Sequence, residues 1–216
     1  MSPLVALVHA TPAAIGPART AFVETFPEAE LWHLLDDRLA ADADAAGGLT
    51  PPLRKRMLTL IGHAVDNGAD AVQLTCSMYG PVAALAGQLW DVPVHGSDET
   101  MLRELGWSRP ARVGVIGSLD SAVADSARRV AEVVPGAEIV PITAAGAAEA
   151  ASSGDAERLS AALENAARGH EVGVFVLAQY SLTPQWMRLE AALSTPVLSP
   201  PQLAAGELRR NLLEAP

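Results

Sequence analysis

The sequence contains one cysteine, Cys76, and its neighbours make this thiol a candidate for acid–base or nucleophilic chemistry. It follows the strand-like run AVQL at 71–74 and stands between two hydroxyl residues, Thr75 and Ser77. A thiol that ends a strand and precedes a helix lies near unpaired backbone N–H groups, which favour the reactive thiolate. An inert core cysteine is the alternative interpretation. A single cysteine also excludes an internal disulfide and a cysteine cluster for metal.

Further polar side chains stand at or just after the ends of apolar, β-branched runs. Hydroxyl and N–H groups in such places can stabilise a developing oxyanion, so we treat these residues as candidates for substrate contact. For each hydroxyl, a capping or loop role is the alternative. The candidates are His9, Thr11, Thr75, Ser77, Ser118, Gln179, Tyr180 and Ser181.

Two histidines end strand-like runs in the first half of the chain. His9 and His95 are therefore candidate partners of Cys76, because a Cys/His pair raises the thiolate fraction. A half-buried histidine satisfied by the backbone is the alternative for both. The remaining histidines, to which we assign no role, are His33, His63 and His170.

The sequence offers no pattern for a metal or an organic cofactor. The five histidines show neither an HExxH motif nor paired ligand spacing. No GxGxxG motif is present, and Lys55 lies in a basic, surface-like helical stretch that does not suit a pyridoxal Schiff base. We therefore predict chemistry without metal or cofactor.

Short β-branched runs alternate with segments of helical period along the whole chain, which is the rhythm of a parallel sheet covered by helices. The rhythm occurs twice. Val5 matches Val113 at a spacing of 108 residues, and Pro81 matches Pro184 at a spacing of 103 residues. One change in loop length explains the difference, so the chain is predicted to contain two copies of one unit. The predicted strands lie at 5–8, 29–35, 71–75, 92–95, 113–116, 137–142, 174–178 and 196–198.

The predicted fold class is α/β with two pseudo-symmetric halves, each a mainly parallel sheet flanked by helices, and a cleft between them. The first half covers 1–96 and the second covers 97–200. A final helix at 202–214 is expected to pack back on the first half. Ligands of open α/β sheets bind beyond the carboxyl ends of the strands, so those ends are the expected site.

Composition narrows the classes of partner. Of the 216 residues, 50% are hydrophobic and 19% are charged, with a formal net charge of −10. This charge repels nucleic acid and gives no attraction to anionic lipid. The start lacks a basic region, and no stretch approaches the roughly 20 apolar residues of a membrane span. We expect a cytoplasmic globular protein with a small-molecule partner, and a homo-oligomer is left open.

Several segments together resemble the aspartate/glutamate racemase superfamily. That superfamily includes amino-acid and hydantoin racemases, maleate isomerases and arylmalonate decarboxylases. The resemblance spans essentially the whole chain and implies a cofactor-independent enzyme in which Cys76 matches the first of two catalytic cysteines. The segments are VALVHATP, LLDD, ADAVQLTCSMYGP, VGVIGS and VFVLAQYSLTP.

The chain departs from the racemase pattern where a second cysteine is expected. The matching segment reads Ala178-Gln179-Tyr180-Ser181, and an uncharged amide cannot exchange protons near neutral pH. Gln179 is thus expected to orient substrate and not to act as a second base. His9-Ala10-Thr11 also replaces the acidic, serine-bearing motif of glutamate racemases, which argues against glutamate as substrate.

Four functional hypotheses follow. The first is an isomerase that acts on a small carboxylate through a carbanion or enediolate, with Cys76 as acid/base. The second is a lyase of the arylmalonate decarboxylase kind, in which one cysteine protonates the carbanion. A covalent route with Cys76 adding to a double bond, as in maleate isomerases, is a third. The fourth is a binding protein that kept the site and lost catalysis.

Overall fold

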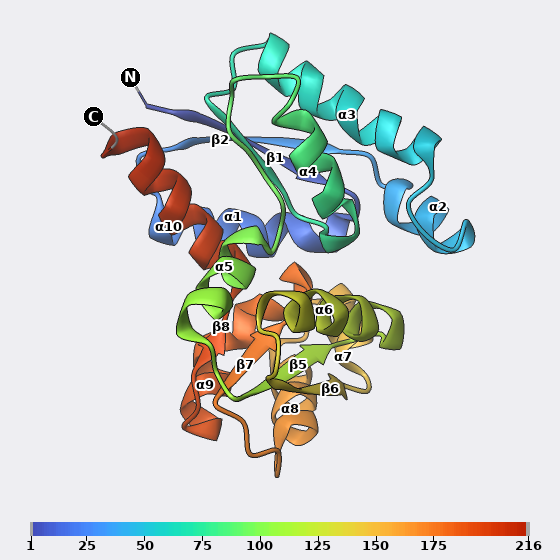
Figure 1. The fold of residues 1–216 in the computed structure, drawn as a ribbon, viewed down its shortest axis with the longest axis vertical. Coiled ribbons are helices and arrows are strands. Elements are labelled where there is room, and N and C mark those ends of the chain that lie inside the picture. Colours follow the sequence, from blue (N-terminus) through green and yellow to red (C-terminus); the bar gives the residue numbers. More distant parts are fainter. Residues whose placement is uncertain (1, 215–216) are drawn as a thin grey trace. The chain divides into compact units, whose positions relative to one another are not determined.

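The structure is a computed structural model that describes residues 2–214. The chain forms two compact units (Figure 1). The first unit runs to Glu99 and takes up the chain again from Pro201, and the second unit is Thr100–Pro200. This boundary lies three residues beyond the one that we drew from the sequence.

The first unit is built on a four-stranded parallel sheet with the order β2-β1-β3-β4. Its strands are β1 (Leu4–His9), β2 (Glu30–Leu35), β3 (Ala71–Leu74) and β4 (Val94–His95). Its helices are η1 (Pro12–Ala14), α1 (Ile15–Thr25), α2 (Leu39–Ala45), α3 (Pro51–Asp66), η2 (Ser77–Tyr79), α4 (Gly80–Ala86) and α10 (Pro200–Leu213), where η marks a 3-10 helix.

The second unit repeats this plan with a parallel sheet of order β6-β5-β7-β8. Its strands are β5 (Arg112–Gly117), β6 (Glu138–Thr143), β7 (Val174–Leu177) and β8 (Val197–Leu198). Its helices are α5 (Glu99–Ser108), α6 (Asp120–Val133), α7 (Ala147–Ser153), α8 (Ala156–Ala167), η3 (Tyr180–Gln185) and α9 (Trp186–Leu193).

The α/β fold class is confirmed, and all eight predicted strands form within two residues of their expected ends. The repeat is also confirmed by the strand register. Val5 pairs with Ala71 in the first sheet, and Val113 pairs with Val174 in the second. These pairs superpose at the spacings of 108 and 103 residues that the sequence showed.

The first sheet is covered on both faces, which explains why most positions of its strands are apolar. One face packs against α3 and α4 through a cluster that includes Val8, Leu74, Met57 and Val82. Figure 1 shows α1 and α10 on the opposite side of the sheet. Each such fully buried aliphatic side chain contributes roughly 1.5–3 kcal/mol to folding.

Helix α3 shows how the local sequence sets the element boundaries. It begins after Thr50 with two prolines, whose fixed φ suits a first helical turn. It ends at Asp66, and Gly68 then adopts a left-handed φ of 89° that a glycine accepts without strain.

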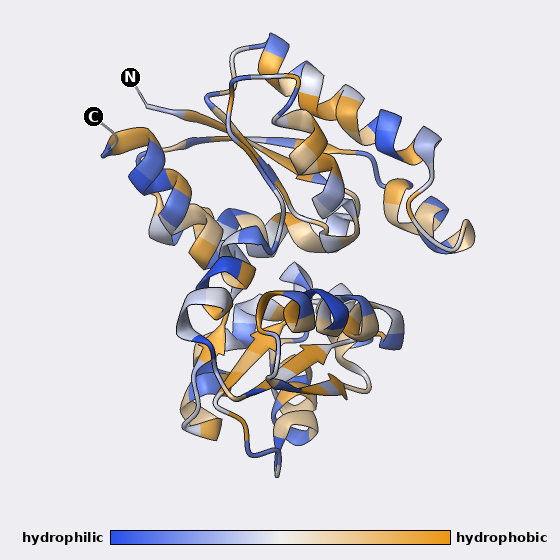
Figure 2. Ribbon diagram, viewed as in Figure 1, coloured by the Kyte–Doolittle hydropathy of each residue, from blue (hydrophilic) through white to orange (hydrophobic). Residues whose placement is uncertain are grey.

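Hydropathy follows the layers of each unit. Figure 2 shows β5 and β7 in hydrophobic colours and mixed colours on the helices around them. Among the described residues, no helix combines the length and the apolar character needed to cross a membrane.

Candidate active site

The carboxyl edge of the first sheet holds most of the polar residues that the sequence singled out in this half. His9 is the last residue of β1, and Thr75, Cys76 and Ser77 follow the end of β3. Because β1 lies beside β3 in a parallel pair, these strand ends are neighbours. Thr11 lies close by in sequence, at the N-cap of η1.

Cys76 is partly exposed and occupies the N-cap position of η2. Its extended backbone (φ −121°, ψ 120°) continues the direction of β3 before the chain turns. Successive side chains of an extended segment point to opposite faces. Cys76 accordingly packs at the rim of the cluster under α3 and α4, whereas Thr75 bonds to His9 on the other face. The thiol is therefore not enclosed in the hydrocarbon core.

His9 lies in a buried hydrogen-bonded network that the sequence did not foresee. Its Nδ1 is 2.9 Å from Thr75 Oγ1, and its Nε2 is 2.9 Å from His33 Nδ1. Burial, and next the nearby His33, lower the pKa of His9 to about 4. Burial, and next the charge of Arg19, lower the pKa of His33. Both rings are neutral at neutral pH.

An ion-paired brace fixes the loop that follows β2. Arg56 on α3 donates to both oxygens of Asp36 (2.7 and 2.6 Å from Nη2) and to Asp42 Oδ2 (2.6 Å). Asp36 also accepts from the backbone N–H of Arg38. The Arg56 guanidinium lowers the pKa of Asp42. Asp36 thus caps the loop after β2, and Arg56 is a partner that sequence analysis missed.

Tyr79 closes the turn that begins at Cys76. Its backbone N–H donates to the carbonyl of Cys76 (3.1 Å), and its hydroxyl donates to the carbonyl of Leu39 (2.9 Å). Burial, and next the proximity of Cys76, raise the pKa of Tyr79 to about 12. The phenol therefore stays protonated and serves to anchor the Cys76 turn to α2.

His95 stands beside Gln73 in the sheet register, on the strand that flanks β3. The Gln73 amide donates to the carbonyls of Leu74 (2.8 Å) and Gly96 (2.9 Å). Gln73 Oε1 and His95 Nδ1 are buried without a hydrogen-bond partner among the described residues. The register places both residues before the strand end that carries Cys76.

In the second unit, the equivalent edge is organised around Gln179. This residue occupies the N-cap of η3, as Cys76 does for η2. Its Oε1 accepts from both the backbone N–H (2.7 Å) and the hydroxyl (2.9 Å) of Ser118, which follows β5. The amide oxygen is thereby occupied, and the NH₂ group remains to donate. Tyr180 and Ser181 begin η3.

Exposure divides the candidates into two sets. His9, Thr75 and Tyr180 expose 0%, 4% and 3% of their surface. The sequence predicted a direct contact between His9 and substrate. The complete burial of His9 favours instead a supporting role in the network with Thr75 and His33. The partly exposed candidates are Thr11, Cys76, Ser77, Ser118, Gln179 and Ser181.

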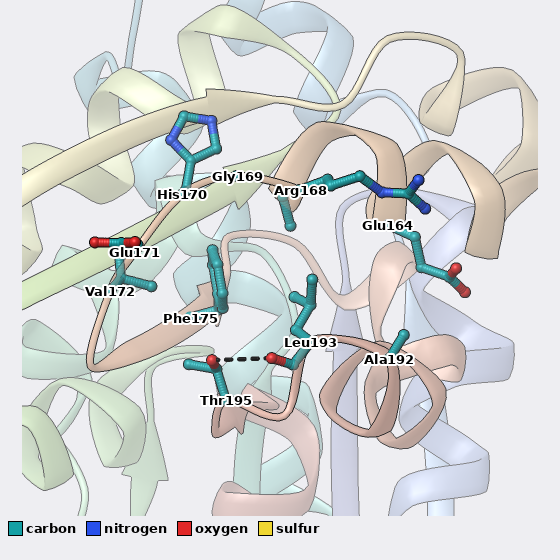
Figure 3. Close-up of a pocket in the computed structure, with 11 residues that line it drawn as sticks. Glu164, Arg168, Gly169, His170, Glu171, Val172, Phe175, Ala192, Leu193 and Thr195 are labelled. Atoms are coloured by element: carbon teal, nitrogen blue, oxygen red, sulfur yellow. Dashed lines mark hydrogen bonds between the residues drawn. The ribbon is translucent and has the colours of Figure 1, made fainter.

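A pocket of about 680 Å³ lies at the opposite, amino edge of the second sheet. Phe175 at the start of β7 and Thr195 just before β8 line it, together with Arg168 and His170. Figure 3 shows the Arg168 guanidinium and the His170 ring directed to different sides of the pocket. Binding sites are marked by convergent polar groups, and this pocket contains none of the residues that the sequence singled out.

Residues 2–214 contain no group of three or more His, Cys, Asp or Glu side chains that could hold a metal ion. Beside the Arg56–Asp36 ion pair, the polar groups at the first sheet's edge are hydroxyls, neutral imidazoles and one thiol. These groups suit proton transfer and oxyanion binding.

Sequence comparison finds no matching family model and no matching curated protein. Comparison of folds finds clear similarity. A glutamate racemase from Thermus thermophilus, solved with β-chloro-D-alanine, aligns with a TM-score of 0.72 at 19% identity, over 98% of this chain and 80% of that one.

Two other solved structures extend the likeness. An allantoin racemase from Klebsiella pneumoniae aligns with a TM-score of 0.70 at 15% identity, over 99% of this chain and 88% of that one. An unliganded arylmalonate decarboxylase aligns with a TM-score of 0.59 at 16% identity, over 96% and 92% of the two chains. At these identities the likeness establishes the fold.

Proposed function

We propose that this chain, which has the two-unit α/β fold of the aspartate/glutamate racemase superfamily, is a cofactor-independent isomerase of small carboxylates. Cys76 is the proposed acid–base group. The observation that carries the proposal is the place of this thiol, the only one in the chain, partly exposed where β3 ends.

In the proposed reaction the Cys76 thiolate attacks a hydrogen on the carbon next to the substrate carboxylate. The C–H bond breaks, the proton forms an S–H bond, and the electron pair moves into the carboxylate as an enediolate. The S–H group then delivers the proton on the same face to a different carbon of the conjugated enediolate, which regenerates the thiolate and completes the isomerisation. The step is balanced without any oxidant, reductant or further reactant.

The enediolate needs hydrogen-bond donors, and the strand ends supply them. The hydroxyls of Thr11 and Ser77 are partly exposed at the first sheet's edge. The first N–H groups of η2 have no acceptor within the helix. The Gln179 amide and the hydroxyls of Ser118 and Ser181, at the strand ends of the second unit, stay proposed substrate contacts. Preorganised donors of this kind stabilise developing oxyanions strongly.

A single thiol limits the stereochemical course. Racemisation requires a proton to leave one face of the carbon and another to arrive on the opposite face. Gln179 cannot deliver it, because an amide does not exchange protons at neutral pH. One thiol suits a proton shift along one face of the substrate, and we propose this course in preference to two-base racemisation.

A lyase is the second candidate, and the single thiol favours it as well. In that reaction the C–C bond to one carboxyl group of a malonate breaks, and carbon dioxide leaves. The electron pair remains on the substrate as an enediolate, which takes its proton from the Cys76 S–H group. The fold similarity to an arylmalonate decarboxylase is compatible with this course.

Thiol labelling tests the central assignment. We expect iodoacetamide to alkylate the native protein rapidly at neutral pH, at Cys76 alone, and small dicarboxylates to protect it. Cys76→Ser is the matched control, since it keeps the shape and removes the reactive group. Alkylation that occurs only after unfolding would overturn the assignment of Cys76.

Proton exchange distinguishes the candidate functions. A panel of α-substituted carboxylates is incubated with the protein in heavy water and followed by NMR. Deuterium uptake without loss of carbon dioxide supports the isomerase, whereas loss of carbon dioxide with deuterium in the product supports the lyase. If the dicarboxylate protects Cys76 but neither change occurs with any compound, the chain is a binding protein and both enzyme proposals are wrong.

A further inference from the structure

Three polar side chains join the carboxyl ends of three adjacent strands in the first unit. We call them the triad: His33 on β2, His9 on β1 and Thr75 directly after β3. Both ring nitrogens of His9 are engaged, one by each of the other members at 2.9 Å. The interplanar angle of 19° between the two imidazoles suits an N–H···N bond in the ring plane. The triad ends one residue before Cys76.

The second unit shows that the fold does not need the triad. At the repeat spacings of 108 and 103 residues, the three equivalent positions hold Gly117, Pro141 and Ala178. The second sheet nevertheless has the same strand order and register. Burying polar side chains costs free energy because they lose their contacts with water. Since the fold forms without this network in the second unit, the network requires another explanation.

The hydrogen-bond polarity of the triad is fixed by a backbone carbonyl. Thr75 Oγ1 lies 3.3 Å from the carbonyl of Val8, which can only accept. If the hydroxyl donates there, then His9 donates from Nδ1 to Thr75 and accepts at Nε2 from the Nδ1–H of His33. This arrangement is the one that satisfies all three contacts at once.

We propose that His33 and His9 are positioning residues, which hold the Thr75 hydroxyl against the Val8 carbonyl and so fix the direction in which the chain leaves β3 at Cys76. This inference rests on the proposed function for its catalytic consequence. The backbone supports it, because the Thr75 N–H donates to the same Val8 carbonyl at 3.1 Å. Two donors from one residue to one acceptor hold that residue rigidly.

The triad acts through shape and hydrogen bonds, not through charge. Burial lowers the pKa of His9 to about 4 and also lowers that of His33, so neither carries a proton at neutral pH. A proton relay would instead require the imidazole of His33 to exchange protons during turnover. The two roles predict different behaviour when His33 is replaced by an amide.

The experiment compares His33→Leu, His33→Asn and Thr75→Val with the wild type. Asparagine places an N–H donor near the position of histidine Nδ1, whereas leucine removes it. We expect His33→Leu and Thr75→Val to lower kcat about tenfold and leave KM nearly unchanged, because a small displacement of a reacting group is costly. His33→Asn should restore most of kcat. His63→Leu, on the exposed side of α3, is the control for removing a histidine.

Two measurements do not depend on activity. In the wild type, ¹⁵N NMR of the imidazoles should show the His9 proton on Nδ1. Amide hydrogen exchange at Thr75 and Cys76 should be about tenfold faster in His33→Leu than in His33→Asn. These results remain decisive if no substrate turns over, so failure of the proposed function and failure of the positioning role are distinguishable.

Three results would overturn the inference. The first is a wild-type His9 with its proton on Nε2, which also decides the matter if His33→Leu does not fold. The second is a folded His33→Leu with wild-type kcat and exchange. The third is a His33→Asn with normal exchange but a kcat as low as that of His33→Leu, which would assign proton transfer to the imidazole.

Discussion

The two units share one scaffold and differ at the strand ends. Both sheets place their first strand beside the second and third, in the same register. At the end of the third strand, the first unit presents Cys76 and the second presents Gln179, each at the N-cap of a 3-10 helix. The difference indicates that the repeat supplies the scaffold, and under the proposed function the acid–base group belongs to one copy alone.

Removing the thiol tests this division most severely. Cys76→Ser should lower kcat/KM by about 10³-fold, because a hydroxyl is a far weaker acid–base group than a thiol near neutral pH. Steady-state kinetics on the substrate found by NMR measures the effect, and circular dichroism checks the fold. If Cys76→Ser keeps its activity, Cys76 is not the acid–base group. The proposed chemical difference between the two units is then wrong.

Acid should weaken the first unit through its buried histidines, which have no equivalents at the second sheet's edge. The pKa of His9 is about 4 in the folded chain and 6.5 ordinarily, so the unfolded chain binds the proton first as the pH falls. The contribution of neutral His9 to the free energy of unfolding is fully present above pH 6.5 and is lost as the pH falls towards 4. It amounts to up to about 3 kcal/mol.

Urea denaturation at pH 7 and pH 4.5 measures this contribution, with His9→Gln as the reference because glutamine does not titrate. The stability difference between wild type and variant should shrink on acidification. Carboxylates whose pKa is lowered by arginine, such as Glu28 beside Arg209, are present in both proteins and cancel. Equal pH dependence in the two proteins would mean that His9 is not held neutral by burial.

The strands and the repeat were predictable, whereas the contacts at the strand ends were not. Alternating β-branched runs and two constant spacings define the eight strands, and a strand end locates Cys76. The hydrogen bond from His9 to His33 depends on β1 lying between β2 and β3. This strand order cannot be predicted from the sequence pattern. The same is true of Ser118 with Gln179, and of Arg56, which reaches Asp36 only after α3 packs.

The packing of the two sheets differs at one equivalent pair, which gives a test of the repeat itself. Ala6 pairs with Val72 in the first sheet, and Gly114 pairs with Phe175 in the second. A Cβ on Gly114 would lie 2.5 Å from Phe175 Cδ1. Gly114→Ala should therefore lower the free energy of unfolding by about 2 kcal/mol.

Reproducing the first unit's pair should relieve the clash, so the double variant should lose less stability than the two single losses add up to. In the double variant Gly114→Ala with Phe175→Val, the smaller valine makes room for the new methyl group. Urea denaturation of both single variants and the double variant gives the coupling. Purely additive losses would show that the two sheets are less alike in their packing than their registers imply.

The smallest effect is expected at Gln179, the counterpart of Cys76. Gln179→Leu removes the acceptor of both Ser118 donors, which should cost about 1 kcal/mol of stability because solvent replaces part of the lost bonding. It also removes the proposed NH₂ donor, so KM should rise about tenfold, which corresponds to about 1.4 kcal/mol of binding. The value of kcat should change little, because Gln179 carries no proton in the proposed reaction. The exposed Gln88→Leu is the control, and a kcat loss comparable to that of Cys76→Ser would show that both strand ends take part in the chemistry.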